Sequence, residues 1–403
     1  MDFATPSPIV GPKVPMRPTR LPLALVAVVL SACPYTDPPF IECVDDTSCG
    51  LHDGGHCLAN AATGHSFCAY PDPGCVGGLR WSDYDVEDSI SGTCVAAAPC
   101  LARFAFEAGD DVWVANADGT GLRNVSVSTY VDVAPQWSPT ADRIAFESSR
   151  AGTRDIFTVK ADGTDLVNLT AGNAALDQRP VWSPGGTSLA FLRDTKLWVM
   201  DAAGSNARQL AALEVFESGG ISWSPDGTRI AFASGDDVYT IAVAGGQPVN
   251  VTNSTGIDAL PAWAPDGTKI AYTVQSGPGD DIWMMNADGA AKVNLTMTPQ
   301  ALEGGASWSP DGTQIVFTSD RDALGGEVYR IAIAAPGAHQ RMTTTDGGEA
   351  APAWSPAGDQ IAYVSAGMSS TTVVIVDPSG AGPVPLTLSN AAMVQPSWAP
   401  ACQ

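Results

Sequence analysis

Short apolar runs alternate with turn residues along most of the chain, and residues 221–252 illustrate the pattern. Apolar and β-branched residues fall in four runs, at 221–223, 229–233, 238–243 and 248–252, separated by clusters of Gly, Pro, Asn and Asp. Runs of this length with such boundaries predict β-strands, because Pro and Gly supply the backbone angles of tight reversals. No run shows a sustained 3.6-residue apolar period, so almost no helix is expected.

A Trp-Ser/Ala-Pro tripeptide recurs seven times, and its spacing defines the repeat. Successive tryptophans are 45, 41, 40, 45, 46 and 44 residues apart. A period in the forties with four strands per unit is typical of a β-propeller, in which each small sheet buries its faces against its neighbours around a ring. The tryptophans are therefore expected to be core residues between blades; they are Trp137, Trp182, Trp223, Trp263, Trp308, Trp354 and Trp398.

The two ends of the repeat region complement each other. The second-strand pattern, Arg-Ile-Ala-Phe and its variants, also occurs seven times, but the first copy, at Arg103, has no Trp strand before it. The last Trp strand, at Trp398, has no second strand after it. We therefore expect an all-β fold, a seven-bladed propeller of four-stranded blades over residues 101–403, with one blade built from both chain ends.

Two cysteines lie at this predicted seam. When the chain is aligned on the repeat, Cys100 and Cys402 fall at the same turn, which in this blade is interrupted because its two strands come from opposite ends of the propeller sequence. A disulfide between them would lock the ring and would add at most about 5 kcal/mol in the chain-entropy picture. The alternative is that Cys100 pairs within an N-terminal cysteine cluster and that Cys402 is free.

Residues 1–32 have the character of an export signal. Three basic residues precede a short apolar stretch at 21–30, which is too short to span a bilayer permanently. Leu30-Ser31-Ala32-Cys33 resembles a bacterial lipobox, the site where a signal peptidase cuts before a diacylated cysteine. This resemblance implies lipidation at Cys33, a tether over residues 33–42 and attachment to a membrane through the lipid alone. An ordinary secretory signal is the alternative, and Met16 is an alternative start.

A cysteine-rich segment, residues 43–100, follows the tether. Without Cys33, eight of the nine cysteines remain, an even number that favours disulfides in an exported chain. Three histidines lie among them, so a zinc site is the alternative, but the spacing lacks the paired Cys-x-x-Cys ligands of such sites. We therefore expect a small disulfide module, loosely similar to those of bacterial surface lipoproteins. Besides Cys100 and Cys402, the candidate cysteines are Cys43, Cys49, Cys57, Cys68, Cys75 and Cys94.

The charge of the chain excludes one class of partner and suggests a site. The formal net charge is −23, and nucleic-acid binding needs a basic surface, so no nucleic-acid partner is expected.

Acidic residues recur five positions before the repeat tryptophan. If the strand that carries the tryptophan starts at the same end of every blade, these residues lie together at one end of the channel. Carboxylates held close together recruit a cation, such as Ca²⁺ or a partner's Lys or Arg. The alternative is that each caps backbone N–H groups of its own loop. The residues are Asp132, Asp177, Asp258, Glu303 and Glu349.

One copy of the repeat carries the motifs of a known family. It reads Pro261-Ala262-Trp263-Ala264-Pro265-Asp266-Gly267-Thr268-Lys269-Ile270-Ala271-Tyr272, followed by Asp281-Ile282-Trp283, Ala287-Asp288-Gly289 and Asn294-Leu295-Thr296. This pattern resembles the WD40-like repeat of the TolB family, over the chain from Leu101 to its end. TolB is a periplasmic propeller protein that joins an envelope complex and binds a peptidoglycan-associated lipoprotein. TolB has six blades, an α/β N-terminal domain and no lipid anchor, so the resemblance implies interaction in the cell envelope but not the TolB partners.

Two classes of function are consistent with these features. The first is a non-catalytic, monomeric lipoprotein of the bacterial envelope, periplasm-facing or in the outer membrane, whose propeller binds protein or glycan. It needs no catalytic residue, resident metal or cofactor, apart from Ca²⁺ or another cation at the channel mouth. The alternative is a glycosidase or lyase that uses the channel carboxylates. The repeated Gly-Asp-Asp and Asn-x-Ser/Thr motifs are interpreted as turn and strand residues.

Overall fold

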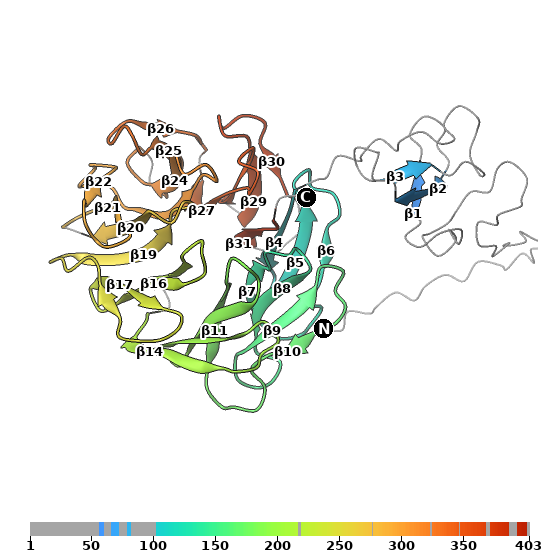
Figure 1. Cartoon of the computed structure of the whole chain (residues 1–403). Coiled ribbons are helices and arrows are strands. Elements are labelled where there is room, and N and C mark those ends of the chain that lie inside the picture. The colour runs from blue at the N-terminus through green and yellow to red at the C-terminus, as the bar shows by residue number, and fades with distance from the viewer. Residues whose placement is uncertain are drawn as a thin grey trace, which may run out of the picture. The chain divides into compact units, whose positions relative to one another are not determined.

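Seven four-stranded antiparallel sheets form a ring in the computed structural model of the chain (Figure 1). The structure describes residues 56–59, 66–71, 79–81 and 102–400, except 217–218, 276, 323–324, 346, 368–370 and 387–392. The chain divides into two compact units, Met1–Cys100 and Leu101–Gln403. The predicted all-β, seven-bladed propeller is confirmed, and the described residues contain no α-helix.

In each of the first four blades the strand that contains the repeat tryptophan is innermost, and the other three strands follow it outward. Blade 1 consists of β31 (Met393–Trp398), β4 (Arg103–Ala108), β5 (Asp111–Asn116) and β6 (Arg123–Asn124). Blade 2 consists of β7 (Asp132–Trp137), β8 (Arg143–Ser148), β9 (Asp155–Lys160) and β10 (Val167–Asn168). Blade 3 consists of β11 (Asp177–Trp182), β12 (Ser188–Arg193), β13 (Lys196–Asp201) and β14 (Arg208–Glu214). Blade 4 consists of β15 (Ile221–Trp223), β16 (Arg229–Ser234), β17 (Asp237–Ala242) and β18 (Val249–Asn250).

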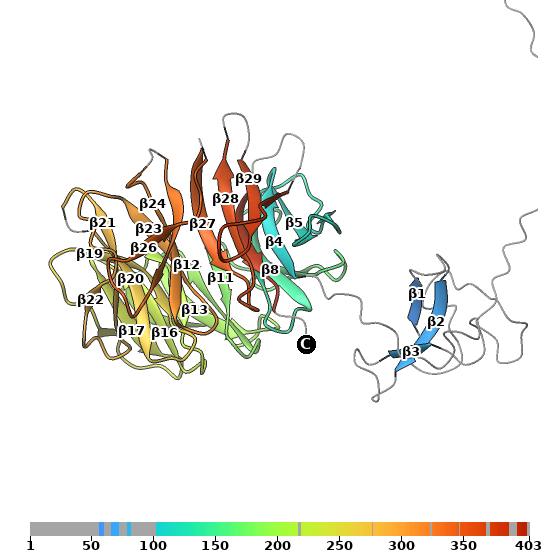
Figure 2. The ribbon, with the colours of Figure 1, turned by 90° about the horizontal axis from the view of Figure 1, so that it is seen from above.

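The last three blades repeat the same order, and Figure 2 shows the blades from above. Blade 5 consists of β19 (Ile257–Trp263), β20 (Lys269–Gln275), β21 (Asp280–Asn286) and β22 (Val293–Asn294). Blade 6 consists of β23 (Glu303–Trp308), β24 (Gln314–Ser319), β25 (Glu327–Ala332) and β26 (His339–Arg341). Blade 7 consists of β27 (Gly348–Trp354), β28 (Ile361–Ala366), β29 (Thr371–Val376) and β30 (Val384–Pro385).

Blade 1 is built from both ends of the propeller sequence. Strand β31 pairs antiparallel with β4, which places Met393 opposite Ala108 and Trp398 opposite Phe104. Strands β4, β5 and β6 then pair in sequence order, as in the other blades. The closure predicted from two incomplete repeats is therefore confirmed. Cys100 and Cys402 lie outside the described residues, so the disulfide between them stays a prediction.

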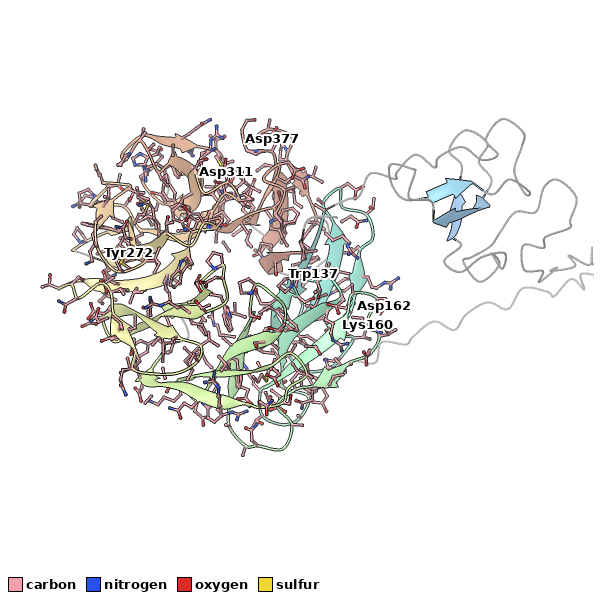
Figure 3. The ribbon with its side chains drawn as sticks, in the orientation of Figure 1. Trp137, Lys160, Asp162, Tyr272, Asp311 and Asp377 are labelled. Carbon is pink, nitrogen blue, oxygen red and sulfur yellow. The ribbon has the colours of Figure 1, made fainter. Side chains whose placement is uncertain are left out.

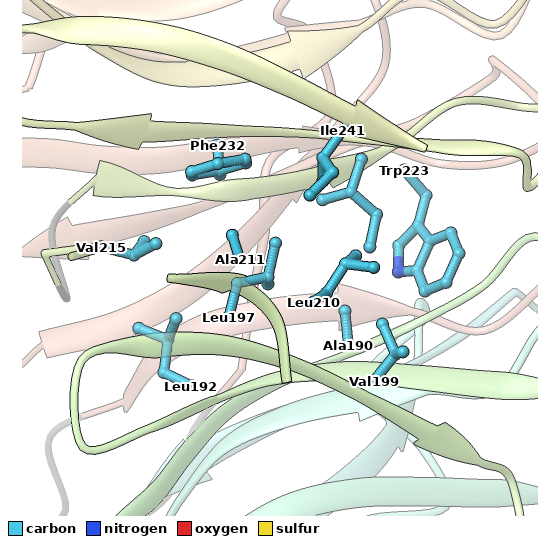
Figure 4. Close-up of a cluster of buried hydrophobic side chains, with 11 residues drawn as sticks. Ala190, Leu192, Leu197, Val199, Leu210, Ala211, Val215, Trp223, Phe232 and Ile241 are labelled. Carbon is cyan, nitrogen blue, oxygen red and sulfur yellow. The ribbon is translucent and has the colours of Figure 1, made fainter. Parts of the chain in front are cut away.

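The hydrophobic core lies between the blades rather than within any one of them. In Figure 4, Leu192 and Val199 of blade 3 belong to one buried cluster with Trp223, Phe232 and Ile241 of blade 4. Six further clusters join the other neighbouring pairs of blades in the same way, including blade 7 with blade 1. Each large apolar side chain buried in this way contributes about 1.5–3 kcal/mol. A blade therefore depends on its neighbours for stability.

The repeat tryptophans contact the preceding blade in two ways, and one residue type decides between them. Four of them donate the indole N–H to a carbonyl of the preceding blade: Trp182 to Gln136, Trp223 to Val181, Trp308 to Ala262 and Trp398 to Ala353, at 2.9–3.2 Å. In the other three blades the equivalent residue is serine, and its hydroxyl accepts the backbone N–H of the tryptophan: Ser397 from Trp137, Ser222 from Trp263 and Ser307 from Trp354. In this second group Trp263 donates its indole N–H to the carbonyl of Gly267 at 3.1 Å, whereas the indole N–H groups of Trp137 and Trp354 have no hydrogen bond in the structure.

The described part of the N-terminal unit is one small sheet. Its strands are β1 (His56–Ala59), β2 (Ser66–Pro71) and β3 (Leu79–Trp81), and Cys57 lies opposite Cys68 in the backbone register. The predicted signal segment, Cys33, the tether and the remaining cysteines of the module lie outside the described residues. Within the part of the chain that the structure describes, no helix has the length and apolar character needed to span a membrane.

Candidate functional site: the central channel

A bulge interrupts the innermost strands and shapes the wall of the channel. The pairing register between β7 and β8 shifts between Val133 and Gln136, and equivalent shifts occur in blades 1, 3, 5, 6 and 7. A bulge leaves backbone groups unpaired and redirects the side chain. The residue three positions before tryptophan has a positive φ in six blades. These residues are Ala134, Arg179, Gly220, Leu260, Gly305 and Ala351.

The innermost strands enclose a cavity of about 400 Å³. Its walls come mainly from β7, β11, β15, β23, β27 and β31, and most of the lining residues are Ala, Pro, Val or Ile. Phe216, which is 55 % exposed and follows β14, also lines it. A concave, largely apolar cavity of this size with few polar groups is typical of a ligand site. The central channel is therefore the candidate functional site.

Arg179 is the charged side chain of this lining. Its backbone N–H donates to Oε1 of Glu147 at 2.8 Å, which holds the bulge in place. Within the described residues the half-buried guanidinium of Arg179 has no hydrogen bond, ion pair or aromatic contact, whereas every other arginine of the described propeller has at least one. A guanidinium with unused donors is suited to binding a carboxylate or phosphate.

The five predicted channel-mouth carboxylates lie at the start of the innermost strands, and all are at most 3 % exposed. Three of them pair with an arginine at the end of the second strand of the same blade: Asp132 with Arg150 at 2.6 Å, Asp177 with Arg193 at 2.7 Å, and Glu303 with Arg321. Each of these arginines also lies over an aromatic ring of its own blade. These three carboxylates therefore stabilise their own blades.

Glu349 has hydroxyl partners in place of an arginine. It accepts hydrogen bonds from Ser365 at 3.1 Å, Thr343 at 3.3 Å and Thr345. The same Thr343 hydroxyl lies 2.5 Å from Glu327 of blade 6, so two buried carboxyl groups share the single proton of one hydroxyl. Burial raises the pKa of Glu349, and the negative charge of Glu327 raises it further.

Asp258 is also without an ion pair in the described residues and is 1 % exposed. Burial raises its pKa, although the hydroxyls of Ser254 and Thr252 act in the opposite direction. No hydrogen bond or ion pair among the described residues joins one of the five predicted carboxylates to another. Their binding of a cation or a partner's basic residue stays a prediction.

A different set of acidic residues connects the third and fourth strands. Asp237 accepts Nδ2 of Asn250 at 2.8 Å, the hydroxyl of Thr252 at 3.1 Å and the backbone N–H of Ser254 at 3.0 Å. The same Asp–Asn hydrogen bond recurs in three more blades. The Asn-x-Ser/Thr motifs and the aspartates at the start of the third strands therefore form one structural unit. Its signal in the sequence is the constant spacing of 13 residues between Asp and Asn.

A metal centre formed by protein side chains alone is not evident in the described residues. Among them, no group of three or more His, Cys, Asp or Glu side chains is placed to hold a metal ion. The chemistry that the channel does offer is an apolar surface with one available guanidinium. Arg179 was not among the predicted site residues, because the sequence does not indicate which side chain a bulge turns toward the channel.

The repeat region of the chain matches a known family. Residues 193–403, just over half of the chain, match the family model described as PD40, TolB beta propeller domain. The chain belongs to this family. Among curated proteins, it is 31 % identical over 108 residues to tricorn protease homolog 1 of Streptomyces coelicolor. That match covers 25 % of this chain and only 10 % of the relative, so this chain spans about a tenth of the relative's length.

Several solved propeller structures are similar to this chain in fold. TolB from Acinetobacter baumannii has a TM-score of 0.51 at 19 % identity, covering 74 % of this chain and 67 % of that one. A puromycin hydrolase has a TM-score of 0.56 at 16 % identity, covering 70 % and 53 % respectively. An oligogalacturonate lyase from Vibrio parahaemolyticus has a TM-score of 0.55 at 11 % identity, covering 71 % and 85 %. At these identities the likeness concerns the fold alone.

Proposed function

We propose that this chain is a non-catalytic binding protein of the bacterial cell envelope, whose propeller channel takes up an anionic segment of a protein or glycan partner. The observation that carries the proposal is Arg179, which lines a cavity of about 400 Å³ with largely apolar walls and whose guanidinium has no partner among the described residues. Charged groups that are partly removed from water are normally paired with an opposite charge. An unpaired guanidinium at a cavity therefore favours a ligand that supplies the missing negative charge.

The location in the envelope is supported by the sequence. The export-signal character of residues 1–32, Cys33 in its lipobox-like context and the even number of remaining cysteines all favour an exported, lipid-anchored protein. Attachment would then occur through the lipid alone, with the propeller acting as a monomer. The fold of TolB from Acinetobacter baumannii, a propeller of the same family, is consistent with this role.

The burial of the channel-mouth carboxylates favours binding over glycan cleavage. A glycosidase needs two carboxyl groups that reach the bond to be broken, one as acid and one as base or nucleophile. Asp132, Asp177 and Glu303 are each at most 3 % exposed and paired with an arginine of their own blade. A lyase or glycosidase that uses these residues would need them released from those pairs.

Site-specific crosslinking in native cells tests the proposal. A photoreactive amino acid is placed at Ala351, in the channel lining, or at Lys292, on the exposed outer surface. Crosslinked partners are expected from position 351, and Arg179→Gln should reduce their yield about tenfold, which corresponds to one lost charge-assisted hydrogen bond. Equal capture from position 292, or capture that is unchanged in Arg179→Gln, would contradict the proposal.

A separate assay addresses catalysis. The purified full chain is incubated with anionic and neutral polysaccharides, and the products are measured beside the double variant Glu303→Gln/Asp258→Asn. The proposal predicts no turnover by either protein. Turnover that the double variant abolishes, while its circular dichroism spectrum shows that it is still folded, would establish a carbohydrate-active enzyme instead.

A further inference from the structure

A second pocket, of about 430 Å³, lies between blades 1 and 2, away from the channel lining. It is formed by residues of β5, by the residues that begin β4 and β6, and by the end of β9 with the turn that follows it. Three cationic side chains, Arg103, Arg123 and Lys160, contribute to its lining. Lys160 and Asp162 lie together at the outer side of blade 2, and Trp137 lies farther in (Figure 3). Two carboxylates also line the pocket, so its three cations give the lining a net formal charge of +1 in a chain with a net charge of −23.

The repeat supplies six internal comparisons for this pocket, because the strand register identifies the equivalent positions in every blade. No other pair of neighbouring blades has more than one cation at the three positions. In chain order the other sets are Arg143, Val167 and Asp201; Ser188, Arg208 and Ala242; Arg229, Val249 and Asn286; Lys269, Val293 and Ala332; Gln314, Gln340 and Asp377; and Gln360, Val384 and Asn116.

The donors of these three cations are largely unused within the described residues. The guanidinium of Arg103 lies 5.2 Å from the ring centroid of Trp137 and makes no hydrogen bond. Arg123 uses Nη1 for the carbonyl of Asp162, at 3.0 Å. The ammonium of Lys160 is 3.9 Å from Asp165, a carboxylate already paired with Arg143 at 2.7 Å. Most of the N–H groups at the pocket are therefore available to a ligand.

The two carboxylates of the pocket are occupied by their own turns. Asp162 accepts the backbone N–H and the hydroxyl of Thr164, at 2.9 and 2.6 Å. Asp142 accepts the hydroxyls of Ser138 and Thr140. The hydrogen bonds from Thr164 lower the pKa of Asp162, and the charges of Lys160 and Arg123 act in the same direction. The carboxylates therefore do not neutralise the three cations by direct ion pairs.

A buried donor in the pocket wall also lacks a partner. Trp137 is 5 % exposed, and its Nε1 has no hydrogen bond in the structure. In four other blades the same atom donates to the preceding blade, but in blade 2 the hydroxyl of Ser397 accepts the backbone N–H of Trp137 instead. The Nε1 of Trp354 is also buried without a partner, so this unpaired donor belongs to the blades with the serine contact and does not by itself indicate a ligand.

We propose that the pocket between blades 1 and 2 is an anion site that binds a soluble phosphomonoester or inorganic phosphate. Two guanidinium groups and one ammonium match the charge and the three acceptor oxygens of a dianionic phosphate better than those of a single carboxylate. The site is independent of the channel, so it adds a second ligand to the binding function rather than explaining the first.

The repeat also provides variants that should fold. Arg103→Gln, Arg123→Val and Lys160→Ala each introduce a residue that the chain already has at the equivalent position of at least two other blades. A matched control removes three cations elsewhere: Arg208→Val, Lys269→Gln and Lys292→Ala. Binding of inorganic phosphate and of glycerol 3-phosphate to the full chain is measured by ³¹P NMR titration at about pH 7.5, where phosphate is mainly dianionic, with chloride keeping the ionic strength constant.

The triple variant in the pocket should lose at least about tenfold in phosphate affinity, whereas the control should bind like the wild type. Arg103→Gln alone should give a smaller loss. Absence of phosphate binding by the wild type, or equal binding by the two triple variants, would overturn the proposal. Acetate that binds as tightly as phosphate would overturn the assignment to a dianion. None of these outcomes bears on crosslinking in the channel.

Discussion

Trp398 and Phe104 lie opposite each other in one sheet, with ring centroids 5.5 Å apart, although they come from opposite ends of the propeller sequence. Trp398 also donates its indole N–H to Ala353 of blade 7 at 2.9 Å. This residue therefore joins the start of the propeller, its end and the neighbouring blade. Because the core lies between blades, these contacts connect the stability of the seam with that of the whole ring.

Trp398→Ala should lower the free energy of unfolding by about 3–5 kcal/mol, because it removes a large packed side chain and an inter-blade hydrogen bond. Urea denaturation of the full chain, followed by circular dichroism, measures this change. Val384→Ala, on the outer strand of blade 7 and 36 % exposed, serves as the control and should cost less than about 1 kcal/mol. Equal losses for the two variants would show that the seam does not limit stability.

Glu349→Gln should change how stability depends on pH. Burial raises the pKa of Glu349 above its ordinary value of 4.5, so the protonated form is favoured in the fold. Its contribution is fully present below about pH 4.5 and is lost as pH rises through the folded-state pKa. Glutamine stays neutral, so the variant should be more stable than the wild type at neutral pH, and the difference should shrink toward about pH 4. Melting temperatures over this range measure the effect.

Glu303→Gln provides the contrasting control for that experiment. Glu303 pairs with Arg321, so the substitution leaves a largely buried guanidinium without its partner and should destabilise the protein by about 3 kcal/mol at neutral pH. If Glu349→Gln were instead destabilising at neutral pH by a similar amount, its carboxylate would have to be ionised and stabilised in the fold.

The sequence predicted the elements that every repeat must share. Tryptophan spacing indicated the blades, and the two incomplete repeats at Arg103 and Trp398 indicated the seam, because inter-blade burial imposes the same pattern seven times. The sequence did not predict the role of Arg179, since a bulge decides which side chain reaches the channel. It also did not predict that Glu349 lacks an arginine where Glu303 has one. Such differences between blades depend on side-chain contacts that occur in one blade alone, and the consensus pattern of the repeat does not show them.

The Asp–Asn–Thr unit of the outer strands should be structural. Asp281 accepts Nδ2 of Asn294 at 2.8 Å, the hydroxyl of Thr296 at 3.1 Å and the backbone N–H of Thr298 at 2.7 Å. Asp281→Ala leaves these donors unsatisfied and should cost about 2–3 kcal/mol in chemical denaturation. Asp288→Ala, in an exposed turn, should cost less than about 1 kcal/mol. Added Ca²⁺ should leave the stability of the wild type unchanged. If Ca²⁺ raised the stability of the wild type but not that of Asp281→Ala, a calcium site would be indicated instead.

The bulge in blade 7 predicts a stabilising glycine substitution. Ala351 has a φ of 49°, a conformation that costs a side-chain-bearing residue about 1–2 kcal/mol and glycine little. Blades 4 and 6 already have glycine at this position, Gly220 and Gly305. Ala351→Gly should therefore raise the free energy of unfolding by about 0.5 kcal/mol, because the relieved backbone strain exceeds the greater loss of backbone entropy by glycine.

Ala353→Gly is the control. Ala353 lies two residues along the same strand, in regular pairing with Ala362, and its replacement by glycine should lower the free energy of unfolding by about 0.5–1 kcal/mol. Chemical denaturation of the three proteins side by side distinguishes these signs, and a destabilised Ala351→Gly would mean that packing of the methyl group in the channel wall outweighs the backbone strain.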